Sequence, residues 1–297
     1  MDRLIKLPSF DGIAAGATAY VNAPLGLRYK NLNLSVTNTA GDPFNTLVSD
    51  VTLEIDNVVQ RTYSTDDDIT TMPELYMAGY DSYVGWFGEV YTKFTSMAEV
   101  AKESTPFTIW FKEPWMLGGP ASQELFSWSM GGVVSFQIKV RLKPGISTAG
   151  LKVSATALVD NTVVPLGAIR KRYRTQVAVN SIGNLDFVRL PKNNAYLSIL
   201  PQTDALADIS LKLDGAVIIE GTRDEVVASS AVQNIANFSA SGSGYFPYLV
   251  FNADRNPASA LPMKKADGEP VQNFALRLGM TAASSFDMVY ETVGFKD

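Results

Sequence analysis

Alternation of apolar and polar residues is the dominant pattern along this chain. An extended segment that alternates in this way has one apolar and one polar face, so each such segment predicts a half-buried β-strand. The alternating segments are residues 29–36, 51–55, 134–142, 151–158, 196–200, 209–213, 274–278 and 286–293. Turn-rich stretches separate them, such as Lys-Pro-Gly-Ile-Ser-Thr-Ala-Gly at 143–150. The pattern therefore predicts an all-β protein.

The order of these strands occurs twice. Residues 51–55 are followed by Asp-Asn, and residues 209–213, which begin 158 positions later, are followed by Asp-Gly. A proline precedes a tyrosine by five positions ahead of both segments, at 24 and 29 and at 191 and 196. Each half also ends in two alternating segments separated by a loop of small residues, and we expect the two segments of the second half, 274–278 and 286–293, to pair with each other. A repeat of this length exceeds the roughly 20–50 residues of a solenoid unit, so it predicts two copies of one domain-sized β fold.

Helices are predicted to be few and short. Thr222 and Glu225 form a capping box, which predicts a helix that begins there. Residues 64–69 hold the equivalent place in the first half, and their Ser-Thr cap with an acidic first turn suits a helix N-terminus. Two long excursions follow, at 73–130 and 234–272. We expect the first, which holds all four tryptophans, to fold onto its domain, and the second, rich in small and polar residues, to project from the surface.

The predicted elements narrow the fold. An all-β domain with short strands and Gly- or Pro-rich loops is a sandwich or a barrel. Two such domains in tandem predict two jelly-roll β-sandwiches, a double jelly roll, with short inserted helices and long loops. We place the N-terminal jelly roll at residues 1–160 and the C-terminal jelly roll at residues 183–297. Residues 161–182 form a basic linker between them in this interpretation.

Composition and charge exclude several classes of function. The chain has 297 residues, of which 46% are hydrophobic and 19% charged, as expected for globular domains rather than disorder. Its net charge of −5 argues against a surface built to bind nucleic acid. The absence of His and Cys excludes disulfides, Ser–His and Cys–His catalysis, and zinc sites with these ligands. Residues 1–8 lack the apolar core of a signal peptide. The sequence contains no uninterrupted run of about 18 apolar residues, so no membrane-spanning helix is predicted.

The candidate functional residues are Arg170, Lys171, Arg172 and Arg174, a basic cluster in a net-acidic chain. In one interpretation they face the phosphate groups of lipids or of a genome, where each charge contributes about 1 kcal/mol of attraction near an anionic surface. In the other interpretation, which we favour, they lie in an interdomain or intersubunit linker and pair with carboxylates. The cluster is therefore a candidate membrane-facing or subunit-facing patch.

Two further clusters have both a binding and a structural interpretation. The three aspartates at 66–68 offer carboxylates to Ca²⁺, but no EF-hand spacing follows them, so an acidic helix N-terminus is favoured. Trp110, Trp115 and Trp128 have aromatic faces that suit a sugar, yet packing in a core or between subunits is favoured. No phosphate loop, acid pair at defined spacing or nucleophile motif is present. We therefore assign no catalytic, metal or cofactor residue and expect neither enzyme activity nor a cofactor.

Several stretches together resemble one protein family. They are Leu-Pro-Ser-Phe-Asp-Gly-Ile-Ala-Ala-Gly at 7–16, Pro-Leu-Gly at 24–26 with Tyr29, Leu-Glu-Ile-Asp at 53–56, the basic segment at 170–174, Leu-Lys-Leu-Asp-Gly at 211–215 and Val-Tyr-Glu-Thr-Val-Gly at 289–294. In order and spacing, this set is similar to the major capsid proteins of tailless icosahedral phages with an internal membrane, of the corticovirus type. Tectiviruses and adenoviruses are more distant relatives. The resemblance covers most of the chain and is weakest over 73–130 and 234–272.

The resemblance implies a structural protein, a double jelly-roll major capsid protein of a bacteriophage. Such proteins form pseudo-hexagonal homotrimers, which tile an icosahedral shell over an internal membrane. The implied partners are further copies of the chain, neighbouring trimers, minor and vertex capsid proteins, and the lipid headgroups of the membrane, with no specific nucleic-acid binding. The implied location is the virion, after synthesis in the host cytoplasm.

A function of a different class also fits two β-sandwiches in tandem, namely a carbohydrate- or ligand-binding module. Independent binding modules are usually joined by flexible Gly/Ser-rich or Pro-rich linkers. Residues 161–182 are neither. The linker therefore favours the capsid protein over the binding module.

Overall fold

The computed structural model describes residues 1–64, 107–112, 124–187, 190–232, 247, 249–251, 257–265 and 267–296. The chain divides into two compact units, each of them all-β. The N-terminal unit is Met1–Arg172 with Phe295–Asp297, and the C-terminal unit is Tyr173–Gly294. The division falls inside the segment predicted as a basic linker, where strand β10 (Ile169–Ala178) runs.

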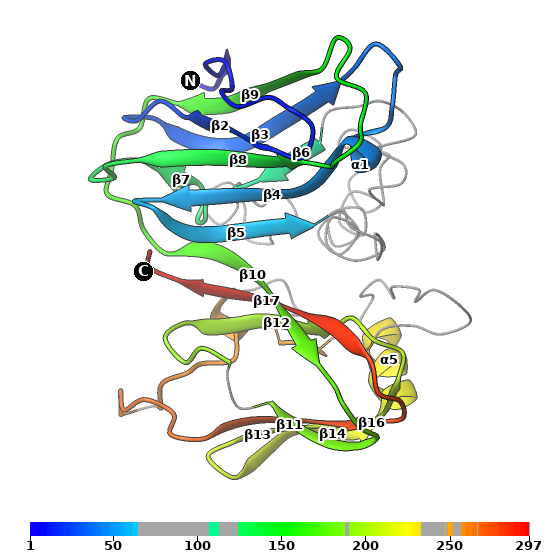
Figure 1. Ribbon diagram of the computed structural model, residues 1–297. Helices are drawn as coiled ribbons and strands as arrows, with labels where there is room; N and C mark the ends of the chain where they lie inside the picture. The colour runs from blue at the N-terminus through cyan, green and yellow to red at the C-terminus, as the bar shows by residue number, and fades with distance from the viewer. Residues whose placement is uncertain are drawn as a thin grey trace. The chain divides into compact units, whose positions relative to one another are not determined.

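The N-terminal unit consists of two sheets (Figure 1). One sheet has the strand order β1-β9-β3-β6, with the short β7 also paired to β3, and the other has the order β2-β8-β4-β5. A one-turn helix, α1 (Phe44–Leu47), connects β3 to β4. The strands are β1 (Arg3–Lys6), β2 (Thr18–Asn22), β3 (Arg28–Thr37), β4 (Val48–Ile55), β5 (Val58–Ser64), β6 (Phe107–Trp110), β7 (Trp128–Ser129), β8 (Phe136–Leu142) and β9 (Lys152–Asp160).

The C-terminal unit also consists of two sheets, with the strand orders β10-β17-β12-β15 and β11-β16-β13-β14. Helix α5 (Arg223–Val232) follows β14, and a short 3₁₀ helix, η1 (Pro257–Ser259), follows β15. The strands after β10 are β11 (Gly183–Phe187), β12 (Ala195–Pro201), β13 (Leu206–Leu213), β14 (Ala216–Thr222), β15 (Leu249–Val250), β16 (Phe274–Met280) and β17 (Ser285–Gly294).

The two units have the same topology. With β7 left aside, β1 to β9 correspond one by one to β10 to β17 in sheet position. In each unit, consecutive strands lie in different sheets, except for the hairpins β4–β5 and β13–β14. Eight strands distributed in this way over two sheets form a jelly roll. The all-β, double jelly-roll fold class predicted from the sequence is therefore confirmed, and β4 and β13, which contain residues 51–55 and 209–213, are equivalent strands.

One sequence-based expectation is wrong. The last two strands of the second half do not pair with each other, because β16 lies between β11 and β13 whereas β17 lies between β10 and β12. The strands β8 and β9 of the first half are separated between the two sheets in the same way. Both strands of each pair are half-buried because they face one core from opposite sheets. Alternation identifies the buried face of a strand but not the sheet to which it belongs.

Three β-bulges recur at equivalent positions in the two units. A bulge places one extra residue in a strand, which bends it and increases its twist. The extra residues are Lys30 in β3 and Leu197 in β12, Ser49 in β4 and Ala207 in β13, and Gln60 in β5 and Ile218 in β14. The similarity of the two halves therefore extends from strand order to local register.

The equivalent hairpins also share their turn chemistry. The β4–β5 turn has positive φ at Asp56 (52°) and Asn57 (65°), and the β13–β14 turn has positive φ at Asp214 (47°) and Gly215 (87°). Two-residue turns of this kind match the twist of the strands and favour Asp, Asn and Gly. Asp56 Oδ1 accepts hydrogen bonds from the two N–H groups just ahead of β8, at 2.7 and 2.9 Å, and Asp214 Oδ1 accepts from the two just ahead of β16, at 2.9 and 2.6 Å.

Each core contains an equivalent tyrosine. The hydroxyl of Tyr29 donates to the carbonyl oxygen of Pro24 at 2.7 Å, and the hydroxyl of Tyr196 donates to that of Pro191 at 2.7 Å. Each tyrosine ring packs against the phenylalanine that begins β8 or β16, with ring centroids 5.1 and 5.0 Å apart. The five-residue Pro–Tyr spacing noted in the sequence therefore corresponds to the same hydrogen bond in both units.

Helix α5 begins at the predicted capping box. The backbone N–H of Thr222 donates to Glu225 Oε2 at 2.7 Å, and the N–H of Glu225 donates to Thr222 Oγ1 at 3.3 Å. This helix is confirmed, whereas residues 65–69 of the other predicted helix lie outside the described residues. Much of the two excursions also lies outside the described part of the chain. No helix of the described ranges is long and apolar enough to cross a membrane.

Candidate functional site

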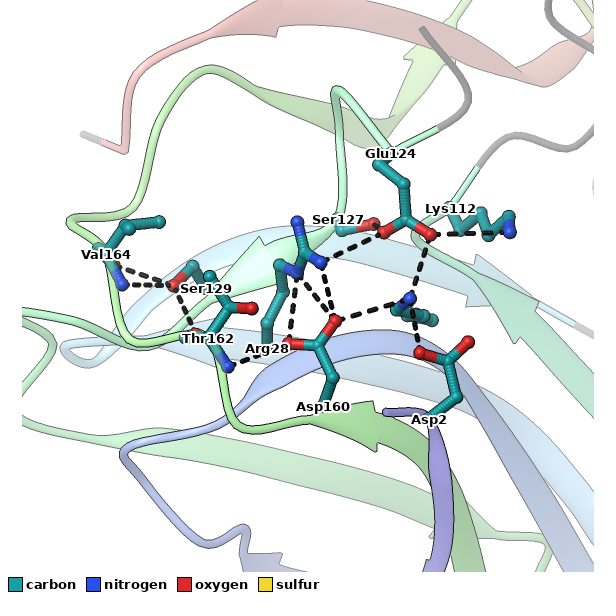
Figure 2. A network of polar contacts seen from close by, with 10 residues as sticks. Asp2, Arg28, Lys112, Glu124, Ser127, Ser129, Asp160, Thr162 and Val164 are labelled. Carbon is teal, nitrogen blue, oxygen red and sulfur yellow. Dashed lines mark hydrogen bonds and ion pairs between the residues drawn. The ribbon is translucent and has the colours of Figure 1, made fainter. Parts of the chain in front are cut away.

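The N-terminal unit contains a network of charged side chains where β3 begins and β9 ends (Figure 2). It is electrically balanced, with three cations and three anions, namely Arg28, Lys30, Lys112, Asp2, Glu124 and Asp160. The side chains of Lys30 and Asp160 are each only 6% exposed. Burying a charge is costly unless the charge is paired and hydrogen-bonded. The close pairing described next therefore offsets the cost of burying these two groups.

Asp160 and Lys30 are the centres of this network. Arg28 donates to Asp160 Oδ2 twice, from Nη2 at 2.5 Å and from Nε at 3.0 Å, a two-pronged contact that fixes both side chains. The ammonium of Lys30 lies 3.3 Å from the same carboxylate oxygen. Lys30 also donates to Asp2 Oδ1 at 2.6 Å and to Glu124 Oε1 at 2.9 Å. Each buried charge therefore has more than one partner of opposite sign.

The pKa values of the central groups follow from these contacts. Burial raises the pKa of the Asp160 carboxyl, but the hydrogen bonds that it accepts from Arg28, Thr162 and Lys30 outweigh burial and hold its pKa well below the usual range. Burial lowers the pKa of the Lys30 ammonium, but its carboxylate partners more than compensate and raise it. Both groups are therefore charged at neutral pH, as the network requires.

The network ties together stretches that are far apart in the sequence. Asp2, which precedes β1, and Glu124, which lies ahead of β7, both contact Lys30 of β3 (Figure 2). Lys112, which follows β6, joins the network through Glu124. The chain that leaves β9 is held beside it, because the N–H of Thr162 donates to Asp160 Oδ1 at 2.8 Å. The network therefore holds the segments before β1, after β6, before β7 and after β9 together at one end of the N-terminal jelly roll.

The described residues of the C-terminal unit form no equivalent network at these positions. Its strand register places Ala195, Leu197 and Val293 at the positions of Arg28, Lys30 and Asp160. A jelly roll with the same strand order and the same bulge therefore forms with apolar residues at these three places. The network is a specific feature of the N-terminal unit and not a requirement of the fold.

The network was not predicted from the sequence. Strict alternation places Lys30 on the same face as Leu32 and Leu34, and the bulge at Lys30, which depends on the register with β9, changes the direction of its side chain. The one signal is a pair of opposite charges, Arg28 at the start of one strand and Asp160 at the end of another. This signal becomes meaningful only when the pairing of β3 with β9 is known.

The basic cluster at 170–174 lies on β10. Lys171 and Arg172 are 0% and 1% exposed, whereas Arg170 and Arg174 are half-buried. Arg174 forms an ion pair with Asp287. The exposed part of the candidate patch therefore belongs to the side chains of Arg170 and Arg174.

The buried part of this segment lies against β5. Arg172 is paired in parallel with Arg61 of β5, and its guanidinium lies 4.9 Å from the ring centroid of Tyr63. The guanidinium of Arg61 donates to the carbonyl oxygen of Trp110 at 2.6 Å and lies 5.1 Å from the ring centroid of Trp128. Cations over aromatic faces in a dry environment are stabilising. These two arginines hold strands β5, β6 and β10 in place.

The other candidate residues have mixed outcomes. Trp128 is fully buried and stacks on Phe111 at 4.4 Å between centroids, which is the packing role favoured from the sequence. Trp110 lies in β6 and is half-buried. The remaining tryptophan of the candidate sugar platform, Trp115, and the aspartates at 66–68 lie outside the described residues. Within the described ranges, no cluster of three or more potential metal-ligating side chains occurs.

No family model and no curated protein matches the sequence. Solved structures match it over its whole length. The major capsid protein P2 of bacteriophage PM2 is 16% identical, has a TM-score of 0.76 and covers 100% of this chain and 98% of its own. The STIV major capsid protein is 12% identical, with a TM-score of 0.61 over 99% of this chain and 97% of its own. The PBCV-1 virus capsid is 9% identical, with a TM-score of 0.58 over 99% of this chain and 93% of that chain.

The matches cover both units. The chain has the double jelly-roll fold of viral major capsid proteins. The resemblance noted in the sequence is confirmed at the level of this fold. The double jelly-roll neighbours are capsid components by name, and the alternative of a carbohydrate-binding module gains no support from them.

Proposed function

We propose that this protein is a major capsid protein, which assembles with copies of itself into a virion shell. The observation that carries the proposal is the match to the PM2 capsid protein over 100% of this chain and 98% of that one, at a TM-score of 0.76. A match confined to one jelly roll would be weak support, because single sandwich folds host many unrelated functions. A match over two jelly rolls in tandem, with little chain left over on either side, is far more restrictive.

The assembly unit in this function is a homotrimer. Two equivalent jelly rolls in each chain give six similar units in a trimer, which suits a hexagonal outline that can tile a shell. The trimers form an icosahedral shell over an internal membrane, with neighbouring trimers and minor and vertex capsid proteins as partners. The protein acts in the virion after its synthesis in the host cytoplasm.

The exposed parts of Arg170 and Arg174 belong to this proposal. They face either the headgroups of the internal membrane or a neighbouring subunit. The attraction of a cation to an anionic surface extends over a Debye length of about 8 Å at physiological salt. A role at the membrane therefore requires these side chains to lie close to the lipid.

The assembly is tested on the purified full-length chain. Size-exclusion chromatography with light scattering is expected to give a mass about three times the 32.2 kDa of the monomer. Obligate interfaces bury on the order of 2,000–5,000 Å², so the trimer should persist at micromolar concentration. Electron microscopy of native material should show icosahedral particles that contain this chain. A monomer at all accessible concentrations, with no such particles, would contradict the proposal.

A further inference from the structure

Strand β14 lies at the edge of its sheet and has exposed apolar side chains. Val217 and Ile218 expose 51% and 40% of their surface. Strand β14 pairs with β13 on one side, and no strand of the described residues pairs with its other side. An open edge with apolar side chains is a template for pairing with another chain, and natural proteins usually cover or charge such edges. Strand β14 is therefore a candidate interaction surface.

The equivalent edge in the N-terminal unit is covered. Strand β5 corresponds to β14, because Leu53 faces Arg61 in the first hairpin as Leu211 faces Ile219 in the second, with the same bulge after each pair. The outer edge of β5 is lined by the start of β10, which pairs with Arg61 in parallel. Strand β10 is the first strand of its jelly roll. The chain therefore contains two equivalent edge strands. The edge of β5 is covered by β10, whereas the edge of β14 is open within the described residues.

A first strand with a free side is also present. Strand β1 is the counterpart of β10 in sheet position, and it pairs with β9 on one side only within the described part of the chain. Leu4 exposes 64% of its surface at the centre of this strand. Like the start of β10, β1 is basic, with exposed Arg3 and Lys6. It therefore resembles the strand that covers β5 in sheet position and in charge.

The charges around the two open edges are complementary. Glu220 of β14 and Asp208 of the neighbouring β13 are exposed, whereas Asp224 at the start of α5 is paired with Arg223. Strand β1 offers the opposite sign through Arg3 and Lys6. Complementary charge at the rim of a contact steers association and fixes its register, while the apolar residues supply burial.

We propose that β14 of one copy of this chain docks alongside β1 of a second copy, as β5 lies alongside the start of β10. The inference rests on the proposed self-assembly and specifies its contact. The contact joins two different surfaces, so every copy offers one β14 and one β1 and copies associate head to tail. Such heterologous contacts form a closed ring when the rotation between copies allows closure, and three copies close the proposed trimer.

The chain has no Cys, so introduced cysteines report only on the contact tested. A full-length variant with Leu4→Cys and Ile218→Cys should form reducible dimers and trimers under mild oxidation, resolved on a denaturing gel. A disulfide requires Cα atoms about 4.4–6.8 Å apart, which makes the test local. The matched control pairs Leu4→Cys with Ile182→Cys, whose native isoleucine is 71% exposed in the same unit as Ile218. This control should remain mainly monomeric on the gel.

A second variant tests the edge without cross-linking. Ile218→Asp places a charge on the open strand and should reduce the assembled fraction at micromolar concentration at least tenfold, with an unchanged circular dichroism spectrum. Ile182→Asp makes the same change at a more exposed position of the same unit and should assemble as the native chain does. A loss of folding in Ile218→Asp would leave the cross-linking result to decide.

The outcomes separate this inference from the proposed function. If the native chain assembles but the Leu4–Ile218 pair gives no cross-link, the docking of β14 on β1 is overturned and the capsid function stands. Normal assembly of a folded Ile218→Asp variant would overturn the docking in the same way. If the native chain stays monomeric under all conditions and forms no particles, the proposed function fails and the docking fails with it.

Discussion

Some side chains make the same hydrogen bond at equivalent positions in the two halves of this protein. Tyr29 and Tyr196 each donate to a proline carbonyl five residues earlier, and burial raises the pKa of both hydroxyls, which keeps them protonated as donors. Some equivalent positions hold a charged residue in one half and an apolar residue in the other, as with Lys30 and Leu197. Equivalence at the residue scale can therefore be tested one side chain at a time.

Tyr29→Phe and Tyr196→Phe should each lower the free energy of unfolding by about 1 kcal/mol. Each change removes one hydrogen bond and leaves the proline carbonyl without its donor. Urea denaturation followed by circular dichroism measures both losses. Tyr20→Phe, at an exposed ring, is the control and should have no effect. A clear loss at only one of the two equivalent tyrosines would contradict their shared role.

Asp160→Asn should lower the free energy of unfolding by about 3 kcal/mol at pH 7, because it removes the central anion and leaves buried cations short of a partner. The folded-state pKa of Asp160 lies below the unfolded value of about 3.9. Its contribution is therefore fully present above roughly pH 4 and is lost as the pH falls toward the folded-state pKa. The native chain should lose stability over this acid range, and the variant should show a flatter profile in denaturation measured from pH 7 to pH 2.

A matched variant distinguishes the network from the fold. Arg28→Ala, Lys30→Leu and Asp160→Val together introduce the residues that the C-terminal unit has at these positions. Replacement of a whole buried ionic group by apolar residues is often neutral, whereas removal of one member is costly. The triple variant should therefore be more stable than Asp160→Asn. The reverse order of stability would show that the charges are needed for the N-terminal jelly roll itself.

At the scale of elements, the hairpins are the best-defined parts of the chain. Alternation predicted the strands β4 and β13 from the sequence, and the Asp-Asn and Asp-Gly pairs after them are typical of the turns that the structure contains, because both signals are local. The bulges at Gln60 and Ile218 were not predicted, because an extra residue in a strand depends on the register of its partner. The expected pairing of β16 with β17 was wrong for the same reason. Sheet membership is decided by contacts between strands that are distant in the sequence.

The turn aspartates anchor these hairpins to the neighbouring strand. Asp56→Ala should lower the free energy of unfolding by on the order of 1 kcal/mol, because two backbone donors lose their acceptor and Ala is less favourable than Asp or Asn at positive φ. Asp56→Asn keeps an acceptor oxygen and the turn preference, so it should retain most of the stability. Asp214→Ala and Asp214→Asn should follow the same order in chemical denaturation. Equal damage from Asn and Ala would contradict the acceptor role.

At the scale of the whole molecule, the repeat was the strongest sequence signal. It identified two equivalent β domains because the order of motifs survives even where the residues between them differ. The boundary between the domains was predicted within residues 161–182, but neither the strand β10 in which the chain divides nor the burial of Lys171 and Arg172 was predicted. Buried cations of this kind are identified only when their aromatic and carbonyl partners are placed. The charge network escaped prediction for the same reason.

The partly exposed side chains of Arg170 and Arg174 in β10 give a prediction for the assembled protein. Arg170→Gln with Arg174→Gln should leave trimers intact and weaken co-sedimentation with anionic vesicles roughly tenfold or more, since each cation near such a surface contributes about 1 kcal/mol. The effect should be larger at low salt. Arg141→Gln with Arg277→Gln removes two exposed charges elsewhere and should bind vesicles as the native trimer does. Dissociation of the trimer by the first variant would instead assign these arginines to a subunit contact.

The constant register of the two hairpins gives them the same backbone plan. The facing pairs of the first hairpin run from Asp50–Ser64 to Ile55–Val58. Each of them has a counterpart 158 positions later in the second hairpin. A chimera that carries one hairpin twice would therefore keep its length, its turn and its bulge. It would change the side chains at the strand edge, where Arg61 of one hairpin is replaced by isoleucine of the other. Protein engineers can thus vary the edge chemistry of either jelly roll without redesigning its backbone.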